Sequence, residues 1–245
     1  MDSSAKASHP FMYFDLLEAF KQPGCPVCLL SERSVRRYLD GLFYELVNDP
    51  GARDSLLKSH GFCVEHAGLL LETRIAEALG ASIIYKNIVK VILEKFPKPS
   101  PPSSPSTIPS STKERTRLIR EFIRASDPTG RCPACEQRED ASDRAMEALK
   151  NSLDDEAIRL AFQDSDGLCF PHLTQLLQRT QGTGTVKFLL GVTQEKLEAL
   201  QSEMGELIRK NDYRFQSEGI TDREGRAWTK AMRMLSGAGT HKTRE

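Results

Sequence analysis

The sequence predicts an all-α protein made of duplicated helical hairpins, each fixed by a Cys3His metal site, with long helices near the C-terminus. Apolar residues recur at the 3.6-residue period of a helix, first at Val35, Leu39, Leu42 and Leu46. No segment alternates apolar and polar residues between hairpin-type turn signals, which disfavours strands. The third observation is an internal repeat that contains every cysteine of the chain.

The repeat consists of a C-P-x-C motif followed by a C-x-x-H motif. The motifs are separated by 34 residues in the first copy and by 33 in the second. The intervening positions also correspond, because Leu39 and Leu42 fall opposite Met146 and Leu149. We therefore interpret the chain as a duplication. Its candidate metal ligands are Cys25, Cys28, Cys63 and His66 in the first copy and Cys132, Cys135, Cys169 and His172 in the second.

A segment rich in proline and serine separates the two copies. The run PKPSPPSSPSTIPSST, at residues 97–112, cannot bury apolar surface and is typical of a disordered or polyproline-like linker. The predicted organisation is a helical metal-binding repeat at residues 1–96, a linker at 97–113, a second such repeat at 114–237 and a flexible tail at 238–245.

Two further apolar patterns predict helices that pack against other helices. The first is a helical period at Ile84, Ile88, Val91 and Ile92. The second is a heptad seam formed by Val186, Leu190, Thr193, Leu197, Leu200, Met204 and Leu207. The expected partner of this seam is an internal helix such as the one around Ile84. A homodimer through residues 186–207 is the alternative.

The last predicted helix has clear signals at both ends. Thr221 and Glu224 have the spacing of a capping box, and Gly237 is a typical helix stop. We expect this helix to close the core with one apolar face, formed by Trp228, Ala231, Met232 and Leu235.

Three thiolates and one imidazole per copy suit tetrahedral zinc, so two Zn²⁺ sites are expected. Pro26 and Pro133 fit the first turn of a helix, where a missing N–H costs nothing. Cys28 and Cys135 would then lie at helix N-termini, where the dipole favours their thiolate forms. Because four protein ligands leave no position for water, the sites are expected to be structural and not catalytic.

Each copy is expected to close on its own metal ion. A helix from Pro26 to about Val47 and a return segment to Phe62 would have similar lengths. A local loop also costs less chain entropy than one that includes the linker. Pairing the C-P-x-C motif of one copy with the C-x-x-H motif of the other is the alternative. Local closure predicts that Cys25→Ser or Cys132→Ser loosens mainly its own half of the chain.

Two other interpretations of the cysteines remain open. The ligand set could hold an iron–sulfur cluster, or the C-P-x-C pairs could cycle between dithiol and disulfide. A thioredoxin-type motif is less well supported, because such a motif follows a strand. Six buried, metal-free core cysteines would be the structural alternative.

Other polar residues near the motifs are not expected to bind metal. His60 has Asp166 as its counterpart in the second copy, which is typical of a turn residue before glycine. His9 and His241 lie in polar terminal segments and are expected at the surface. Four residues shared between the copies are expected at helix starts or next to the metal ligands: Asp49, Arg53, Asp155 and Arg159.

The charge balance excludes a strong overall field. The chain has 34 Lys and Arg and 34 Asp and Glu, which disfavours binding to nucleic acid or to a membrane. It has no apolar stretch of spanning length, and its first residues do not form a secretory signal, so a cytoplasmic protein is expected. A local basic patch at Arg33, Arg36 and Arg37 leaves a nucleic-acid-associated zinc module as a further alternative.

With these motifs the sequence resembles an uncharacterised prokaryotic family, a numbered domain of unknown function. Its members are similar in having paired C-P-x-C and G-[FL]-C-x-x-H elements in a helical chain. The resemblance extends from about Phe11 to Leu235 and includes all eight candidate ligands. It implies a helical fold and the same sites, but no activity. From the ligand count we expect a noncatalytic protein that acts through a protein partner.

Overall fold

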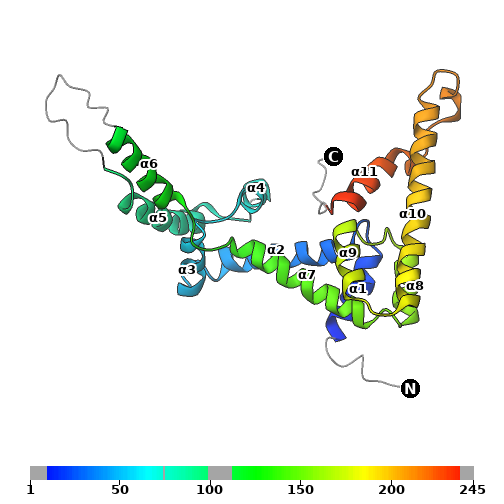
Figure 1. Cartoon of the computed structure of the whole chain (residues 1–245), viewed down its shortest axis with the longest axis horizontal. Helices are drawn as coiled ribbons and strands as arrows, with labels where there is room; N and C mark the ends of the chain where they lie inside the picture. The colour runs from blue at the N-terminus through cyan, green and yellow to red at the C-terminus, as the bar shows by residue number, and fades with distance from the viewer. Residues whose placement is uncertain (1–9, 74, 99–111, 238–245) are drawn as a thin grey trace. The chain divides into compact units, whose positions relative to one another are not determined.

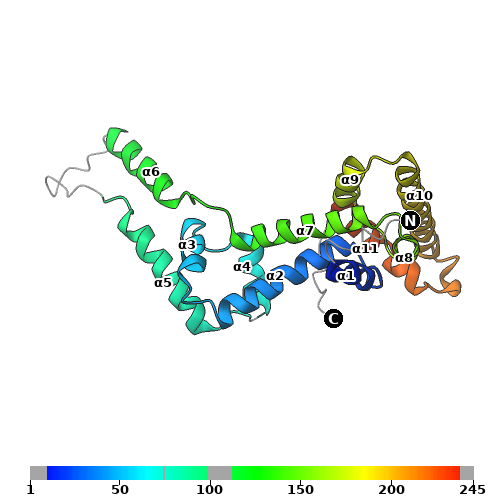
Figure 2. The same cartoon turned by 90° about the horizontal axis from the view of Figure 1, so that it is seen from below.

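The structure is a computed structural model that describes residues 10–73, 75–98 and 112–237 (Figures 1 and 2). Within these ranges the regular structure is helical and contains no strand, which confirms the predicted fold class. The α-helices are α1 (Pro10–Phe20), α2 (Pro26–Tyr44), α3 (Pro50–Lys58), α4 (Val64–Thr73), α5 (Ala78–Glu94), α6 (Thr112–Ser126), α7 (Pro133–Asn151), α8 (Glu156–Asp164), α9 (Phe170–Arg179), α10 (Thr183–Lys210) and α11 (Asp222–Ser236). A short 3₁₀ helix, η2 (Gln216–Glu218), precedes α11.

The chain forms two compact units, and each contains segments from both copies of the repeat. The terminal unit consists of residues 1–34 and 138–245, and the central unit consists of residues 35–137. Helices α2 and α7 each begin in one unit and end in the other. Most of the predicted linker, at 99–111, and the predicted tail lie outside the described residues. The predicted division into two separate repeats stays a prediction.

The terminal unit is built around the aromatic side chain of Phe162 in α8. Phe162 is fully buried, and its ring lies edge-on to Phe20 of α1 at 6.2 Å between centroids. Phe188 of α10 contacts it at 5.9 Å. Tyr13 of α1 also donates a hydrogen bond to Asp155, at the start of α8, at 3.1 Å. The first helix of the chain is thus part of a core made mostly by the second copy.

The central unit contains the apolar residues that the helical period of the first copy predicts. Leu42 of α2 packs with Leu56 of α3 and with Ile84 and Ile88 of α5, and all four are buried. Leu46 differs, because it lies beyond the end of α2 and is 41% exposed. The period therefore identifies the core correctly as far as the helix extends.

The predicted heptad seam lies on α10, but its partner is α11 and not the helix around Ile84. Leu200 of α10 is buried with Ala227 and Met234 of α11, and Leu197 and Met204 pack against them. The helix around Ile84 is α5, which belongs to the central unit. A homodimer through residues 186–207 stays a prediction, and it would have to displace α11 from part of this seam.

Helix α11 has the predicted ends but a different buried face. Thr221 and Glu224 form the capping box, and Gly237 ends the helix with a φ of 69°. Trp228, Met232 and Leu235 are 52%, 59% and 54% exposed, so the predicted apolar face is wrong at these three positions, whereas Ala231 packs against the core as expected. The buried positions of α11 are Glu224, Ala227 and Met234, and the small side chain of Ala227 lets α11 approach α10 closely. Among the described residues, no helix is both long and apolar enough to cross a membrane.

Candidate metal centres

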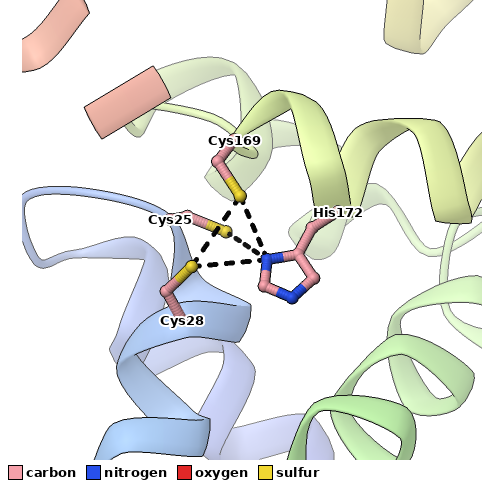
Figure 3. A group of neighbouring side chains, drawn as sticks. All are labelled: Cys25, Cys28, Cys169 and His172. Carbon is pink, nitrogen blue, oxygen red and sulfur yellow. Dashed lines mark hydrogen bonds between the residues drawn. The ribbon is translucent and has the colours of Figure 1, made fainter. Parts of the chain in front are cut away.

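The eight candidate ligands lie in two groups of four, and each group combines motifs from both copies. Site A consists of Cys25, Cys28, Cys169 and His172, all in the terminal unit (Figure 3). Site B consists of Cys63, His66, Cys132 and Cys135, all in the central unit. In each group the donor atoms lie within 4.8 Å of one another.

Helix starts position the ligands of site A. Cys25 directly precedes α2, and Cys28 lies in its first turn. Cys169 is the N-cap residue of α9, with Pro171 and His172 following in its first turn. Figure 3 shows the four side chains pointing toward one another from the blue start of α2 and the yellow-green start of α9. The prolines thus begin both helices at the motifs, as predicted for α2.

The donor atoms of site A surround a space the size of one ion. The Sγ atoms of Cys28 and Cys169 are 3.7 Å apart. The Nδ1 atom of His172 lies 3.5 Å from Cys25 Sγ, 3.3 Å from Cys28 Sγ and 3.1 Å from Cys169 Sγ. Site A therefore presents three sulfur atoms and one ring nitrogen at comparable separations.

Site B repeats this geometry with the other two motifs. The Sγ atoms of Cys63 and Cys135 are 3.6 Å apart. The Nδ1 atom of His66 lies 3.2 Å from Cys63 Sγ, 3.7 Å from Cys132 Sγ and 3.5 Å from Cys135 Sγ. Cys132 and Cys135 come from the start of α7, and His66 comes from the first turn of α4.

The expectation of local closure is wrong. Leu69 and Leu70 of α4 pack against Val35 and Leu39, which lie two to three turns beyond Cys28 in α2. The return segment after α3 is not extended, because the chain turns at His60, with a φ of 54°. The first C-x-x-H motif therefore stays beside the middle of α2, where Ala134 of α7 completes the cluster. Side-chain packing therefore outweighs the lower entropy cost of closing the shorter loop that local pairing would need.

The distances fit a single tetrahedral ion in each site. Zinc–sulfur bonds of about 2.3 Å in a tetrahedron place two sulfur atoms about 3.8 Å apart. The Sγ–Sγ separations of 3.7 Å and 3.6 Å agree with this spacing. They are also far longer than a disulfide bond of about 2.05 Å, and all six cysteines are free. The residues present thus could hold one metal ion per site.

Residues outside the motifs hold the ligands of site A. Ser142 of α7 lies 3.0 Å from His172 Nε2, so its hydroxyl can accept a hydrogen bond from the Nε2–H group and leave Nδ1 free for metal. Asp166 accepts a hydrogen bond from the backbone N–H of Gly24, next to Cys25, at 2.8 Å. Lys230 of α11 pairs with the same carboxylate at 3.0 Å. Sequence reasoning missed these contacts, because only the paired His60 and Asp166 positions drew attention to this turn.

The C-terminal helices also support the turn before Cys169. Lys196 of α10 donates hydrogen bonds to the backbone carbonyls of Gln163 at 2.6 Å and Ser165 at 2.5 Å. At the end of α11, a Cβ on Gly237 would lie 3.3 Å from Cys169 Sγ. The last two long helices thus stabilise site A as well as the core.

The two shared aspartates act at helix starts and not at the metal sites. Asp49 and Asp155 cap α3 and α8, accepting hydrogen bonds from Ala52 N and Ala157 N at 2.8 Å and 2.9 Å. Arg159 stacks over the ring of Phe188 at 3.9 Å. The helix-start role is confirmed for both aspartates. His9 and His241 lie outside the described residues.

Without metal, site A retains protons. Hydrogen bonds with Cys169 and Cys25 raise the pKa of the Cys28 thiol far above its ordinary value, so without metal the thiolate form expected at this helix start is not favoured. Burial lowers the pKa of His172, but hydrogen bonds with Cys169 and Cys25 raise it to about 10. Burial raises the pKa of Cys25, but hydrogen bonds with Cys169, Cys28 and His172 bring it well below its ordinary value. At pH 7, a metal ion must displace protons from Cys28 and His172.

Metal affinity at site A is therefore expected to decrease as the pH is lowered. The protons displaced from Cys28 and His172 predict a decrease of at least about 100-fold in apparent affinity per unit decrease in pH. The check is a competition titration with a chromophoric chelator between pH 6 and about 8. Calorimetry in buffers of different ionisation enthalpy should give the number of protons released. An affinity independent of pH would contradict this protonation pattern.

Ser142→Ala is expected to weaken metal binding at site A alone, by about 10- to 100-fold. The substitution removes the acceptor that orients His172, while all four ligands remain. Competition with a chelator, read separately for the two metal ions, measures the effect. Ser152→Ala, in the turn after α7, is the control in the same unit. An equal loss at site B would show that the change is a general destabilisation.

The comparisons with known proteins agree with this description but assign no activity. The chain is 26% identical over 223 residues to an "Uncharacterized 23.9 kDa protein in xynA 3'region" from Caldicellulosiruptor sp. (strain Rt8B.4). The alignment covers 91% of this chain and 99% of that protein. No solved structure matches. Residues 11–242 match a family of unknown function, DUF6062. The chain, with its paired Cys and His motifs, therefore belongs to the DUF6062 family.

Proposed function

We propose that this protein is a noncatalytic helical scaffold in which two structural zinc ions each connect the two copies of the repeat. The observation that carries the proposal is the donor set, which is three cysteines and one histidine within 4.8 Å of one another in both sites. Zinc prefers these ligands in a tetrahedron, and closed sites with four protein ligands are structural. No coordination position is left for the water molecule that a hydrolytic zinc needs.

The same compactness argues against an iron–sulfur cluster. A cluster places several iron and sulfide ions between its ligands and holds them farther apart than a single ion does. The Sγ–Sγ separations of 3.7 Å and 3.6 Å leave room for one ion only. A dithiol–disulfide cycle would compete with metal binding for the same cysteines. Mononuclear zinc is thus the better supported cofactor.

Exposed apolar side chains on the central unit support a role in binding a protein partner. Val64 and Leu71 of α4 are 93% and 83% exposed, and Tyr44 at the end of α2 is 87% exposed. Exposed apolar groups of this size are common at interaction sites. The weaker alternative is a nucleic-acid-associated role, which rests on the basic residues Arg33, Arg36 and Arg37. A cytoplasmic location is part of the same proposal.

Metal analysis with an absorption spectrum tests the cofactor assignment. The experiment uses untagged full-length protein purified without oxygen. Two zinc ions per chain and no visible absorption are expected. Iron with sulfide-to-iron absorption would replace the proposal with electron transfer or sensing. Metal-free, folded protein with reactive thiols would support the redox alternative.

Release of the two zinc ions is expected to occur in two phases. Cys25, Cys28 and Cys169 of site A are buried, whereas the three cysteines of site B are half-buried. A chelator or alkylating reagent should therefore reach site B first. Stopped-flow chelation should show one zinc per chain leaving before the other, and Cys135→Ser should abolish the fast phase. A single phase for both ions would contradict the burial argument.

A further inference from the structure

The positive charge of the chain is concentrated in one segment of the central unit. Residues 78–126, which include α5 and α6, contain nine Lys or Arg and three Asp or Glu. This segment therefore has a net charge of +6, and the rest of the chain has −6. The expectation of no membrane partner rests on the zero net charge of the whole chain. A local field of this size can act independently of that total.

Helix α6 separates its apolar side chains from four of its five basic ones, and the fifth, Arg115, lies on the apolar face. At 100° per residue, its apolar face contains Leu118, Ile119, Phe122 and Ile123. Its opposite face contains Lys113, Arg117, Arg120 and Arg124. Ile119 and Ile123 are 47% and 58% exposed, and within α6 only Ala125 is buried. The protein's own core thus leaves most of this apolar face uncovered.

The end of α5 extends the exposed apolar surface. Val89, Leu93 and Phe96 are 51%, 61% and 45% exposed. Phe96 is joined to α6 by an edge-on contact with Phe122, at 5.7 Å between ring centroids. The two helices therefore contribute to a single apolar and basic region of the central unit.

A shallow hollow on α5 shows the same combination of groups. Its volume is about 1050 Å³. Apolar lining comes from Ile83, Val89 and Leu93, and cationic lining comes from Arg53, Lys86 and Lys90. Such a surface offers aliphatic contact beside groups that attract phosphate.

We propose that α5, α6 and Phe96 bind the surface of a membrane that contains anionic lipids. An amphipathic helix with isoleucine and phenylalanine on one face and Lys and Arg on the other lies at the boundary of headgroups and acyl chains. The apolar side chains would enter this boundary, and the cations would lie at the lipid phosphates. The association is peripheral and does not depend on either metal site.

Other occupants fit this surface less well. A second copy bound by the same surface would bring two segments of net charge +6 together, and these would repel. A nucleic acid would neutralise the cations but would leave Ile119 and Ile123 in water. An anionic lipid surface satisfies both the charge and the apolar side chains.

Vesicle co-sedimentation of the full-length, zinc-loaded protein tests the proposal. The probes are vesicles of phosphatidylcholine alone and vesicles with about 30% phosphatidylglycerol, at about 0.1 M salt. The bound fraction should be at least about tenfold higher on the anionic vesicles and should fall as salt is raised. Equal binding to both vesicles, or binding to neither, would overturn the proposal.

Two pairs of variants locate the surface. The first double variant is Ile119→Ser with Ile123→Ser, and the second is Arg120→Glu with Arg124→Glu. Each should reduce binding to the anionic vesicles at least about tenfold. Two double variants in the terminal unit are the matched controls. The apolar control is Leu160→Ser with Ile208→Ser, whose wild-type side chains are 52% and 75% exposed, and the charge control is Arg144→Glu with Lys187→Glu. Circular dichroism and zinc content confirm that each variant is folded. An equal loss with the controls would overturn the assignment to α5 and α6.

Two further measurements distinguish the other occupants. Gel filtration without lipid would show a dimer that Ile119→Ser with Ile123→Ser converts to a monomer if a second copy covered this face. If the protein bound a DNA duplex more tightly than the anionic vesicles, and this binding required Arg120 and Arg124 but not the two isoleucines, the partner would be a nucleic acid. Either result would overturn the lipid proposal. Monomeric protein with no such duplex binding is the expected outcome.

Discussion

Cleavage of the chain within residues 99–111 is expected to leave both fragments in one zinc-containing complex. Each site takes one C-P-x-C motif from one fragment and one C-x-x-H motif from the other. Structural zinc in small domains contributes on the order of 10 kcal/mol at neutral pH. Two such ions should therefore hold the cleaved chain together, and a chelator should separate its halves.

A protease site inserted in this segment allows the measurement by gel filtration and metal analysis. The cleaved protein should elute as a single species with two zinc ions and should dissociate after treatment with a chelator. The control is the same cleavage in a variant that combines Cys25→Ser with Cys132→Ser, which should dissociate without chelator. Two separately folded fragments with one zinc each would show local closure instead.

Cys25→Ser is expected to loosen α9, although the two lie in different copies of the repeat. Site A connects Cys25 to Cys169 and His172, so loss of this ligand should accelerate amide hydrogen exchange in Phe170–Arg179 by several orders of magnitude. Val64–Thr73, which carries the C-x-x-H motif of the same copy, should stay protected. Cys132→Ser should have the opposite effect, exposing Val64–Thr73 and sparing Phe170–Arg179.

Hydrogen exchange read by mass spectrometry resolves these two segments. Val27→Ala, a buried change within the first C-P-x-C motif, serves as the control, because it removes core volume but no ligand. It should keep two zinc ions and change protection only modestly. Loss of protection in α4 and not in α9 after Cys25→Ser would show that each site is formed by the two motifs of a single copy.

The sequence alone predicts the ligands but not their pairing. The spacing of the motifs identifies the eight residues that the structure brings together in two groups, because Cys and His pairs at this spacing are typical of metal sites. Both possible pairings give the same Cys3His set, so ligand chemistry cannot distinguish them. The decision lies in the packing of Leu69 and Leu70 on Val35 and Leu39, which no local pattern reveals. Entropy of loop closure alone favours the wrong answer.

The helices show a similar limit. Thr221 and Gly237 predict the ends of α11 correctly, because capping depends on neighbouring residues. Its buried face depends on how closely α10 approaches, and Ala227 fits that contact better than the larger Trp228. The polar residues that support site A, such as Ser142 and Lys196, lie far from the motifs in sequence. Only the folded chain brings them together.

If both sites bind zinc as proposed, the pairing of motifs across the two copies sets an order for metal loading during synthesis. All ligands of site B are present once Cys135 has been made, but site A is incomplete until His172 emerges. Before Cys132 is made, the only ligands on the nascent chain are Cys25, Cys28, Cys63 and His66, which together form a complete but non-native Cys3His set. A zinc ion captured then would have to be released before either native site could close. Correct assembly therefore requires that zinc binds after Cys135 has been made, or that it exchanges rapidly between the non-native and native ligand sets.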